Sequence, residues 1–549
     1  MRKKRLFLSI FLLLAFVNLN GCDVSTTKNL GMVSSAHPLA SEAGLDILKK
    51  GGNAFDAAVA VAAALNVVEP MMSGIGGYGT ILIYDAKTGR IRYLDSSGRI
   101  PAAVNSDVFR KPYPDYKKNR RGAKAVSTPG NVNAWKAMSK TYGVLTWEEL
   151  FPPAVRLAEE GFIIGQRLAR IIEDVFKNMP EHAQSIYGKG NIPLEEGERL
   201  IQKDLGSSLR LIAEEGAGVF YGGKLGKAIH GAMRLAGGFL SLEDLKNAQA
   251  EWWEPIHIPY RDNEVYTASP PSTAFPSLIR LGIMSRFDVQ ELGHNSFAML
   301  HRFLEVTKFA FWCRLRFAGD PEVYPPPLDR LLSPDTWQKQ ADSINMHKTQ
   351  PFVYPGLDKK NISHTTHFVV ADSQGNIVSA TQTLGNAFGS RIMPAGTGIW
   401  LNNSLDYCTF EPKGNPMDAH AGRRKLSGDC PTIIVRDGKP WAALGTPGGH
   451  TIGQTVPQMV MNLIDFKMDI EEALAAPRVS FAEPDRILAE EGISPEVIRQ
   501  LEAVGHKVVS VKSLGNAHGL TITYGKDGKP VEIKGAADPR GTGLAKGFK

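Results

Sequence analysis

The chain has 549 residues, of which 43% are hydrophobic and 22% charged, a composition typical of a globular protein. The formal net charge is only +7, and basic residues are scattered apart from the runs 2–5, 117–121 and 423–425. This pattern excludes a strongly basic nucleic-acid-binding surface, and we expect no nucleic-acid partner.

The N-terminus resembles an export signal. Residues 2–5 are basic, and the apolar run 6–17 is too short for a comfortable membrane span. The sequence Leu-Asn-Gly-Cys that ends at Cys22 resembles a bacterial lipobox, in which the cysteine is lipidated. We therefore expect residues 1–22 to be the signal of an exported lipoprotein, in the periplasm or at the cell surface, with the lipid as its only membrane contact. The alternative is a plain signal peptide in which Cys22 is incidental.

The remaining cysteines allow at most one disulfide. They are Cys313, Cys408 and Cys430, and the last two are a possible pair in an exported protein. None belongs to a CxxC motif or a Cys/His cluster, and the chain has no HExxH motif. We therefore expect neither a metal nor a cofactor.

Two helices are predicted near the start of the mature chain. Ser41 can cap the first, and Gly51-Gly52 can end it. Asn53 can cap the second, an Ala/Val-rich helix that is too apolar to be exposed and that ends before Pro70.

The glycines of residues 74–79 have the spacing of a dinucleotide-binding fingerprint. Such a site needs a strand before the glycines and a helix after them. Here the predicted helix precedes them, and two strands follow at 80–85 and 90–95. The order is reversed, so nucleotide binding is excluded.

The rest of the chain divides into a helical part and a strand-rich part. Residues 130–345 are predicted to be mainly helical, and 346–364 to be a long loop. Strands at 367–372 and 377–383 follow, joined by a turn at 373–376. Further helices are predicted at 453–466, 470–476 and 495–504. The pattern indicates a mixed α and β protein with an antiparallel sheet buried between helices.

The start of the first of these strands is a candidate for nucleophilic chemistry. If Ser373 opposes Asn376 in the turn, Thr383 faces Thr366 and lies beside Thr365. A threonine hydroxyl is a poor nucleophile unless a base is next to it. The α-amine of an N-terminal threonine can be that base.

An internal Thr365 has no such amine. Nucleophilic chemistry therefore requires cleavage between His364 and Thr365, directly after the predicted loop. Taken alone, a threonine at a strand start is an ordinary structural residue.

Many ordered segments resemble the γ-glutamyltransferase (glutathione hydrolase) family of N-terminal nucleophile hydrolases. They include SGIGGYG, VSTPGNVNAW, TTHFVVADSQGNIVSATQT, GTGIWLNN and GTPGGHTIGQTV. The resemblance implies an α+β fold, a four-layer αββα sandwich. It also implies a precursor that cuts itself into a large chain, 23–364, and a small catalytic chain, 365–549, which together form one unit.

The resemblance also assigns roles to individual residues. Thr365 becomes the N-terminal nucleophile, and Thr383 matches the second threonine, which orients it. Gly448 and Gly449 match the pair whose N–H groups form the oxyanion hole. Ser427 matches the first of two serines that bind the α-carboxylate of the substrate.

The substrate-binding positions depart from the family pattern. The carboxylate-binding arginine is replaced by Ser97, and Arg99 is a candidate substitute. Four other pocket positions, for a serine, an asparagine, a glutamine or glutamate and an aspartate, are here Gly428, Gly385, Ser404 and Tyr407. With Ser427 and Arg99, we expect Asn403 and Tyr407 to contact the substrate.

These departures bear on the substrate rather than on the reaction. Without the arginine and the aspartate, the two charges that recognise a glutamyl zwitterion are lost. We expect a self-processing amidohydrolase that passes an acyl group from a small-molecule amide or peptide to Thr365, and then to water or an amine. Acyl groups without an α-amine are favoured, such as dicarboxylic-acid monoamides or cephalosporin-type side chains.

Two alternatives remain open. The first is true γ-glutamyl hydrolysis of glutathione-type amides through altered contacts. The second belongs to another class, a catalytically silent exported lipoprotein that acts as a binding protein.

Overall fold

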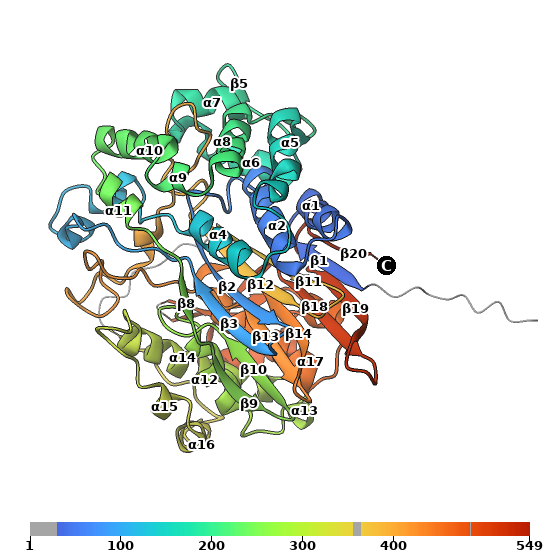
Figure 1. Ribbon diagram of the computed structural model, residues 1–549. Helices are drawn as coiled ribbons and strands as arrows, with labels where there is room; N and C mark the ends of the chain where they lie inside the picture. The colour runs from blue at the N-terminus through green and yellow to red at the C-terminus, as the bar shows by residue number, and fades with distance from the viewer. Residues whose placement is uncertain (1–29, 355–363, 484, 549) are drawn as a thin grey trace, which may run out of the picture.

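The computed structural model describes residues 30–354, 364–483 and 485–548, so the predicted signal and Cys22 lie outside the described residues. The protein has an α+β fold built on two antiparallel sheets (Figure 1). The seven-stranded sheet has the order β20 (Leu544–Phe548), β1 (Gly31–Ser35), β11 (His364–Ala371), β12 (Ile377–Gly385), β2 (Tyr78–Asp85), β3 (Arg90–Asp95), β8 (Glu251–Trp253). The six-stranded sheet has the order β19 (Pro530–Ala537), β18 (His518–Tyr524), β14 (Lys439–Gly445), β13 (Thr432–Arg436), β10 (Asn263–Thr267), β9 (Ile256–Tyr260).

The two sheets face each other across an apolar core. Val369 and Ile377 from the first sheet are buried with Ile433 and Leu520 from the second. Because alternate residues of a strand point to opposite faces, each of these strands supplies a second set of side chains to a helical layer.

Helices cover the outer face of each sheet. On the first sheet lie α1 (Pro38–Lys49) and the fully buried α2 (Ala54–Val68), and the same layer contains α4 (Asn131–Tyr142), α5 (Pro152–Glu160), α6 (Gln166–Val175) and α8 (Lys203–Glu215). On the second sheet lie α12 (Phe275–Met284), α14 (Phe297–Phe317), α16 (Pro334–Asp342), α17 (Ile452–Ile464) and α18 (Ile470–Ala475). Further helices at the periphery are the 12-residue α10 (Lys224–Leu235) and the shorter α3 (Tyr116–Asn119), α7 (Glu181–Tyr187), α9 (Gly218–Tyr221), α11 (Leu242–Lys246), α13 (Val289–Leu292) and α15 (Leu328–Leu331).

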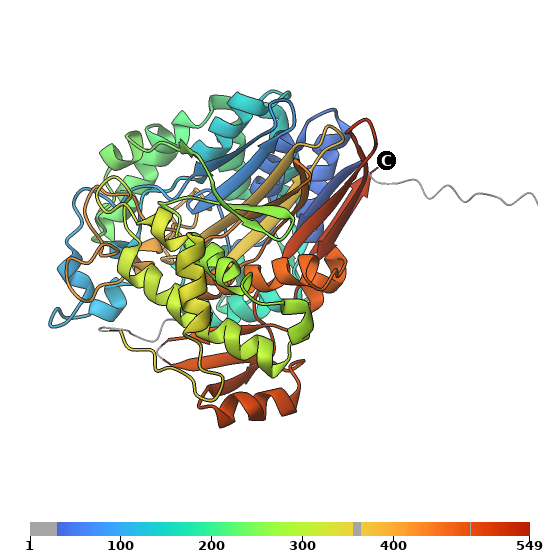
Figure 2. The same ribbon diagram turned by 90° about the horizontal axis from the view of Figure 1, so that it is seen from below.

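A third sheet lies apart from the two large ones. It joins β15 (Val479–Ala482), β16 (Arg486–Glu490) and β17 (Lys507–Val511), with α19 (Pro495–Ala503) beside it. Figure 2 shows this sheet and its helix at the lower side of the molecule, below the two large sheets. Two small ribbons pair β4 (Phe162–Ile163) with β7 (Arg199–Leu200), and β5 (Gly188–Lys189) with β6 (Ile192–Pro193).

The first two helices form where the sequence predicts, but one cap differs. Asn53 caps α2 in a reciprocal capping box with Asp56, as its residue type favours. The predicted cap of α1 is wrong. Its cap is His37, whose ring accepts a hydrogen bond from the Leu39 N–H, and Ser41 lies buried inside the helix. Pro38 starts the helix earlier because proline is favoured in the first helical turn.

The segment 130–345 is less helical than predicted. It contains β8, β9 and β10, and the last two pair around a tight turn at Arg261, whose φ is 53°. Their buried residues alternate along each strand, which is the pattern of a sheet with one face in the core. The sequence analysis missed this short hairpin because helices precede and follow it.

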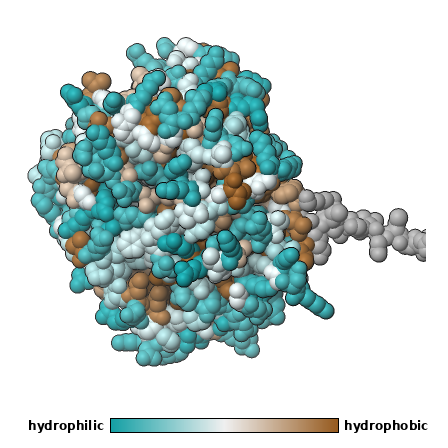
Figure 3. Space-filling view, viewed as in Figure 1, coloured by the Kyte–Doolittle hydropathy of each residue, from teal (hydrophilic) through white to brown (hydrophobic). Residues whose placement is uncertain are grey.

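The surface is mainly polar on the face drawn in Figure 3, where apolar residues are scattered. Among the described residues, no helix is both long enough and apolar enough to cross a membrane. The possible disulfide between Cys408 and Cys430 is absent, and Cys313, Cys408 and Cys430 are free, buried thiols.

Candidate active site

The hairpin of β11 and β12 has a register one residue away from the predicted one. Asp372 caps the turn by accepting hydrogen bonds from the N–H groups of Gln374 and Asn376, so the connection spans residues 372–376. Thr383 therefore faces Thr365 itself rather than Thr366. The shift places the two candidate site residues directly opposite each other.

Thr383 contacts both sides of the predicted cleavage point. Its hydroxyl donates a hydrogen bond to the carbonyl oxygen of His364 at 2.7 Å and accepts one from the Thr365 hydroxyl at 3.3 Å. The Gly385 N–H donates to the same hydroxyl at 2.8 Å. The ladder is irregular between His364 and Thr365, as in a β-bulge, which bends a strand at that point.

The two adjacent threonines have different environments. Thr365 is 3% exposed and lines a cavity at the end of the sheet. Thr366 donates a hydrogen bond at 2.9 Å to the carboxylate of Glu69, at the end of α2. Burial raises the pKa of Glu69, opposed by Arg167 and by this hydrogen bond. Thr366 is thus a structural residue on the helical side of the strand.

The same cavity is lined by a turn of two consecutive glycines. Gly448 has a φ of 139° and Gly449 a φ of 60°, conformations that other residues rarely adopt. Gly449 lines the cavity with Thr365 and Thr383. The turn is supported from behind, because the Thr446 hydroxyl donates to the Pro447 carbonyl and accepts from the Asn516 N–H.

Ser427 lies behind the cavity wall. It is 1% exposed, and its hydroxyl accepts hydrogen bonds from the Thr80 hydroxyl at 3.3 Å and the Asp429 N–H at 3.2 Å. Its neighbours Gly428 and Asp429 line the cavity. Burial raises the pKa of the Asp429 carboxyl to about 6, opposed by Ser427 and Lys425.

Arg99, the candidate substitute for the missing arginine, lies beside the cavity, next to Ile100 and Arg424 of its lining. Its guanidinium pairs with Glu251 at 3.1 Å, with 47% of the side chain exposed. Arg99 does not line the cavity that contains Thr365. At the position of the missing arginine, the Ser97 hydroxyl donates to Asp95 at 2.7 Å.

Asn403 and Tyr407 flank the site from one loop. Asn403 is fully buried, and its side-chain oxygen accepts from the Asn386 N–H at 2.8 Å. That oxygen would be 2.3 Å from a Cβ added at Gly385, so Asn403 fills the space that the glycine leaves. Tyr407 lines the cavity, with its ring 5.9 Å from that of His450.

Four cations line the cavity, Arg314, Arg423, Arg424 and Lys425, and the sequence reading assigned none of them to the site. Lys425 is 2% exposed, and its ammonium lies 3.9 Å from the centre of the Tyr78 ring and 5.5 Å from that of Tyr407. Burial lowers the pKa of Lys425 to about 8, opposed chiefly by Asp429. In the sequence, Lys425 was only one member of a short basic run.

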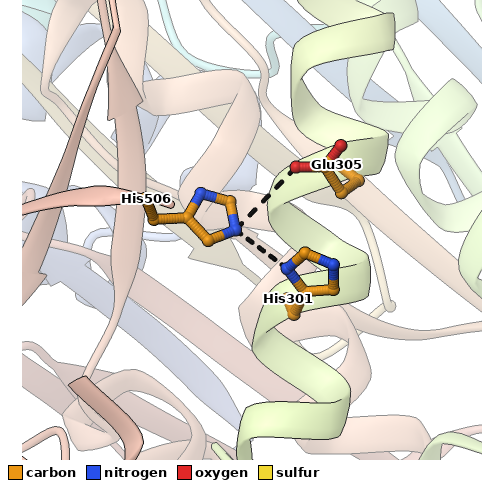
Figure 4. A group of neighbouring side chains, drawn as sticks. All are labelled: His301, Glu305 and His506. Atoms are coloured by element: carbon orange, nitrogen blue, oxygen red, sulfur yellow. Dashed lines mark hydrogen bonds and ion pairs between the residues drawn. The ribbon is translucent and has the colours of Figure 1, made fainter. Parts of the chain in front are cut away.

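A group of histidines and a glutamate lies at another place, between α14 and the third sheet (Figure 4). His301 Nδ1 and His506 Nε2 are 2.9 Å apart, and His506 Nε2 is 3.8 Å from the Glu305 carboxylate. Their ligand atoms are close enough for a metal ion, but Lys308 already pairs with Glu305 at 2.7 Å. A hydrogen-bond network accounts for these contacts, because His301 Nε2 also forms a hydrogen bond with the Asn345 carbonyl.

Comparisons with known proteins agree on one family. The model of the gamma-glutamyltranspeptidase family matches residues 40–548. The "Glutathione hydrolase proenzyme" of Escherichia coli (strain K12) is 36% identical over 531 residues, 93% of this chain and 90% of the relative. The "Acylase ACY 1 proenzyme" of Pseudomonas sp. (strain V22) is 36% identical over 534 residues, 93% and 94% of the two chains.

A solved structure extends the likeness to the fold. The cephalosporin acylase from Bacillus halodurans superposes with a TM-score of 0.86 at 28% identity, covering 98% of this chain and all of the other. Both glutathione hydrolases and acylases are thus among the similar proteins.

Proposed function

Because the chain belongs to the gamma-glutamyltranspeptidase family, we propose that it is a self-processing amidohydrolase that acts on acyl amides without an α-amine. Its relatives are acyl-transfer enzymes and hydrolases of the N-terminal nucleophile type, and the chain is an enzyme of this kind. The alternative of a catalytically silent binding protein finds no support among these relatives.

Self-processing would begin at the bulge between His364 and Thr365. The Thr365 oxygen attacks the carbonyl carbon of His364, and the acyl group moves from nitrogen to oxygen as the C–N bond breaks. Water then hydrolyses the ester and leaves Thr365 with a free α-amine. The hydrogen bond from Thr383 to the His364 carbonyl supports this step, since negative charge develops on that oxygen. The products are a large chain, 23–364, and a small chain, 365–549.

The mature reaction would use the same hydroxyl a second time. The new α-amine of Thr365, with a pKa of about 7.7–8.0 in model compounds, takes the proton of the hydroxyl as it attacks the substrate amide. The N–H groups of Gly448 and Gly449 are the proposed oxyanion donors. The acyl-threonine ester then passes its acyl group to water or to an amine.

The substrate proposal follows from the polar groups at the cavity wall. Ser97 is engaged with Asp95, and Tyr407 stands where the family has an aspartate, so the usual partners of a glutamyl zwitterion are missing. Similarity to two acylases supports a non-glutamyl acyl group. Hydrolysis of γ-glutamyl amides such as glutathione is the second candidate, because glutathione hydrolases are equally similar.

Two broader expectations complete the proposal. The packing of helices outside each of two facing sheets supports a four-layer αββα order. We also infer export to the periplasm or cell surface with lipidation at Cys22, on the sequence pattern alone. Labelling with radioactive palmitate in a bacterial host tests lipidation, because C22A should abolish the label.

The central observation is that Thr383 bridges Thr365 and the His364 carbonyl. A denaturing gel of the wild type should show two chains, and T365A should remain one chain. The processed enzyme is then given glutaryl and γ-glutamyl p-nitroanilides. Equal or faster turnover of the γ-glutamyl compound would favour the second candidate. An uncleaved, inactive wild type would overturn the proposal.

A further inference from the structure

The buried lysine of the cavity lies one strand beyond the threonine pair. Thr365, Thr383 and Tyr78 are cross-strand neighbours on β11, β12 and β2. Neighbouring strands are about 4.8 Å apart, so Tyr78 is about 10 Å from Thr365 across the sheet. The ammonium of Lys425 lies over the Tyr78 ring, and all four residues line the cavity. A short acyl chain bound to Thr365 can extend toward this cation.

Lys425 lacks a polar partner in the described part of the chain. No described acceptor forms a hydrogen bond with its ammonium, and no described carboxylate lies within ion-pair distance. Its contacts are the faces of Tyr78 and Tyr407. Asp429 acts on its charge only from beyond ion-pair distance. A buried cation without an anion in contact is costly. A bound anion would remove that cost.

Arg314 is a further cation of the cavity, which Arg423 and Arg424 also line. Arg314 comes from α14 and lines the same space. Its Nη1 is buried and has no hydrogen-bond partner among the described residues. Its Nε donates a long hydrogen bond of 3.4 Å to the Thr273 hydroxyl. Two buried donors in one cavity are suited to a carboxylate.

We propose that Lys425, supported by the positive charge of Arg314, binds a carboxylate at the far end of the acyl group. The substrate class is then the monoamides of short dicarboxylic acids. This inference rests on the proposed amidohydrolase function and adds the residue that selects the acyl group.

The acidic residue of the same cavity is less suited to recognise a substrate ammonium. Asp429 already accepts hydrogen bonds from the Thr80 hydroxyl, at 3.4 Å. Burial raises the pKa of Asp429 to about 6, so the carboxyl is mostly ionised at neutral pH, and the nearby charge of Lys425 offsets its charge. We therefore do not propose that Asp429 binds the ammonium of a γ-glutamyl group, and the test below treats that binding as an alternative outcome.

The test uses two matched acyl p-nitroanilides on the processed enzyme. One carries a glutaryl group, and the other a glutaryl group whose far carboxylate is replaced by a neutral carboxamide. K425M should lower kcat/KM for the glutaryl probe about 10- to 100-fold, the usual effect of one charged hydrogen bond. It should change the value for the neutral probe less than threefold. K425R should retain part of the preference.

Binding of free glutarate gives a readout that does not depend on turnover. Calorimetry should show glutarate binding to the wild type, and weaker binding by the same factor to K425M. The control is K534M, which removes an exposed lysine of β19 and should change neither measurement. Gels and thermal unfolding establish that each variant is processed and folded.

The charge of Lys425 also predicts a pH dependence. The groups that face it are Asp429, Asp95, Cys408 and Arg314. Since its pKa is about 8, the affinity for glutarate should fall as the pH rises through 8. The α-amine of Thr365 loses its proton in the same range, so K425R should show a smaller fall than the wild type.

The outcomes separate this inference from the proposed function. If the wild type hydrolyses both probes but K425M lowers kcat/KM equally for both, or for neither, the proposed role of Lys425 is wrong and the amidohydrolase function stands. If glutarate does not bind the wild type, the carboxylate site is wrong. If the γ-glutamyl probe alone depends on Lys425, the cation serves an α-carboxylate instead. An uncleaved wild type without turnover counts against the proposed function.

Discussion

The hydroxyl of Thr383 lies between the hydroxyl of Thr365, at 3.3 Å, and the carbonyl oxygen of His364, at 2.7 Å. One side chain thus contacts the proposed nucleophile and the bond that it must break. The relationship depends on the register of a single hairpin, because a slip of one residue would put Thr383 on the other face of the sheet.

Thr383 should control processing more than stability. T383A removes the hydrogen bond to the His364 carbonyl, and we expect precursor cleavage to slow about 100-fold, the usual effect of one lost oxyanion donor. T383S keeps the hydroxyl and should restore most of the rate. The fraction of cleaved chain on a gel over time measures both. Equal rates for T383A and the wild type would show that Thr383 does not stabilise the cleavage step.

Gly385 should tolerate no side chain. It has a φ of 97°, and an added Cβ would lie 2.3 Å from the Asn403 side-chain oxygen. G385A should therefore destabilise the fold by about 1–3 kcal/mol and impair processing, since Gly385 also holds the Thr383 hydroxyl. G396A is the matched control, because Gly396 has a φ of 72° but nothing within 4 Å of the added Cβ. If the two variants unfold at the same temperature, the contact with Asn403 is unimportant.

The hairpin of β11 and β12 shows which structural features the sequence could predict and which it could not. Alternating apolar residues and a Gly-Asn turn predict β11 and β12 correctly, and the family resemblance identifies Thr365. The register could not be fixed, because it depends on hydrogen bonds that the Asp372 side chain accepts from the Gln374 and Asn376 N–H groups, which lengthen the turn by one residue.

The cations of the cavity could not be predicted from the sequence. Arg99 was the nearest cation to the missing arginine along the chain, but its side chain pairs with Glu251 at the surface. Lys425 lies more than 300 residues later and reaches the cavity only because β2 and the loop before β13 meet there. Residue propensity and sequence spacing cannot predict that these two segments meet, because burial of a lysine depends on how the fold packs.

A buried ion pair behind the glycine turn should stabilise the small chain. Arg478 and Asp538 have fully buried side chains 2.7 Å apart, and Asp538 also accepts from the Ala517 N–H. D538A leaves the arginine without its buried partner and should cost about 3–5 kcal/mol. Unfolding in denaturant measures this change.

The matched control breaks a pair at the surface. R499A removes the exposed pair between Arg499 and Glu496, and its unfolding midpoint should equal that of the wild type. If D538A also unfolds at the wild-type midpoint, the buried pair does not hold the segment behind Thr446.

Stability should fall on acidification below neutral pH. Burial lowers the pKa of His518 to about 4, below its usual value of about 6.5. The folded state thus favours neutral His518, so its stabilising effect is complete above pH 6.5 and is lost as the pH falls toward 4. The slope is about 1.4 kcal/mol per pH unit for each such histidine.

A substitution at His518 isolates this effect. H518N should make the slope of unfolding free energy between pH 6.5 and 5 shallower by the amount of one histidine. H347N, at an exposed position, should leave the slope unchanged. Identical slopes for H518N and the wild type would mean that His518 does not titrate with folding.

Intact-mass spectrometry of the purified protein tests the central claim most directly. We predict a small chain that begins at Thr365. Brief exposure to glutaryl p-nitroanilide should add one glutaryl group to it, located at Thr365 by peptide mapping. An N-terminus at any other residue, or an acyl group on any other side chain, would contradict the account.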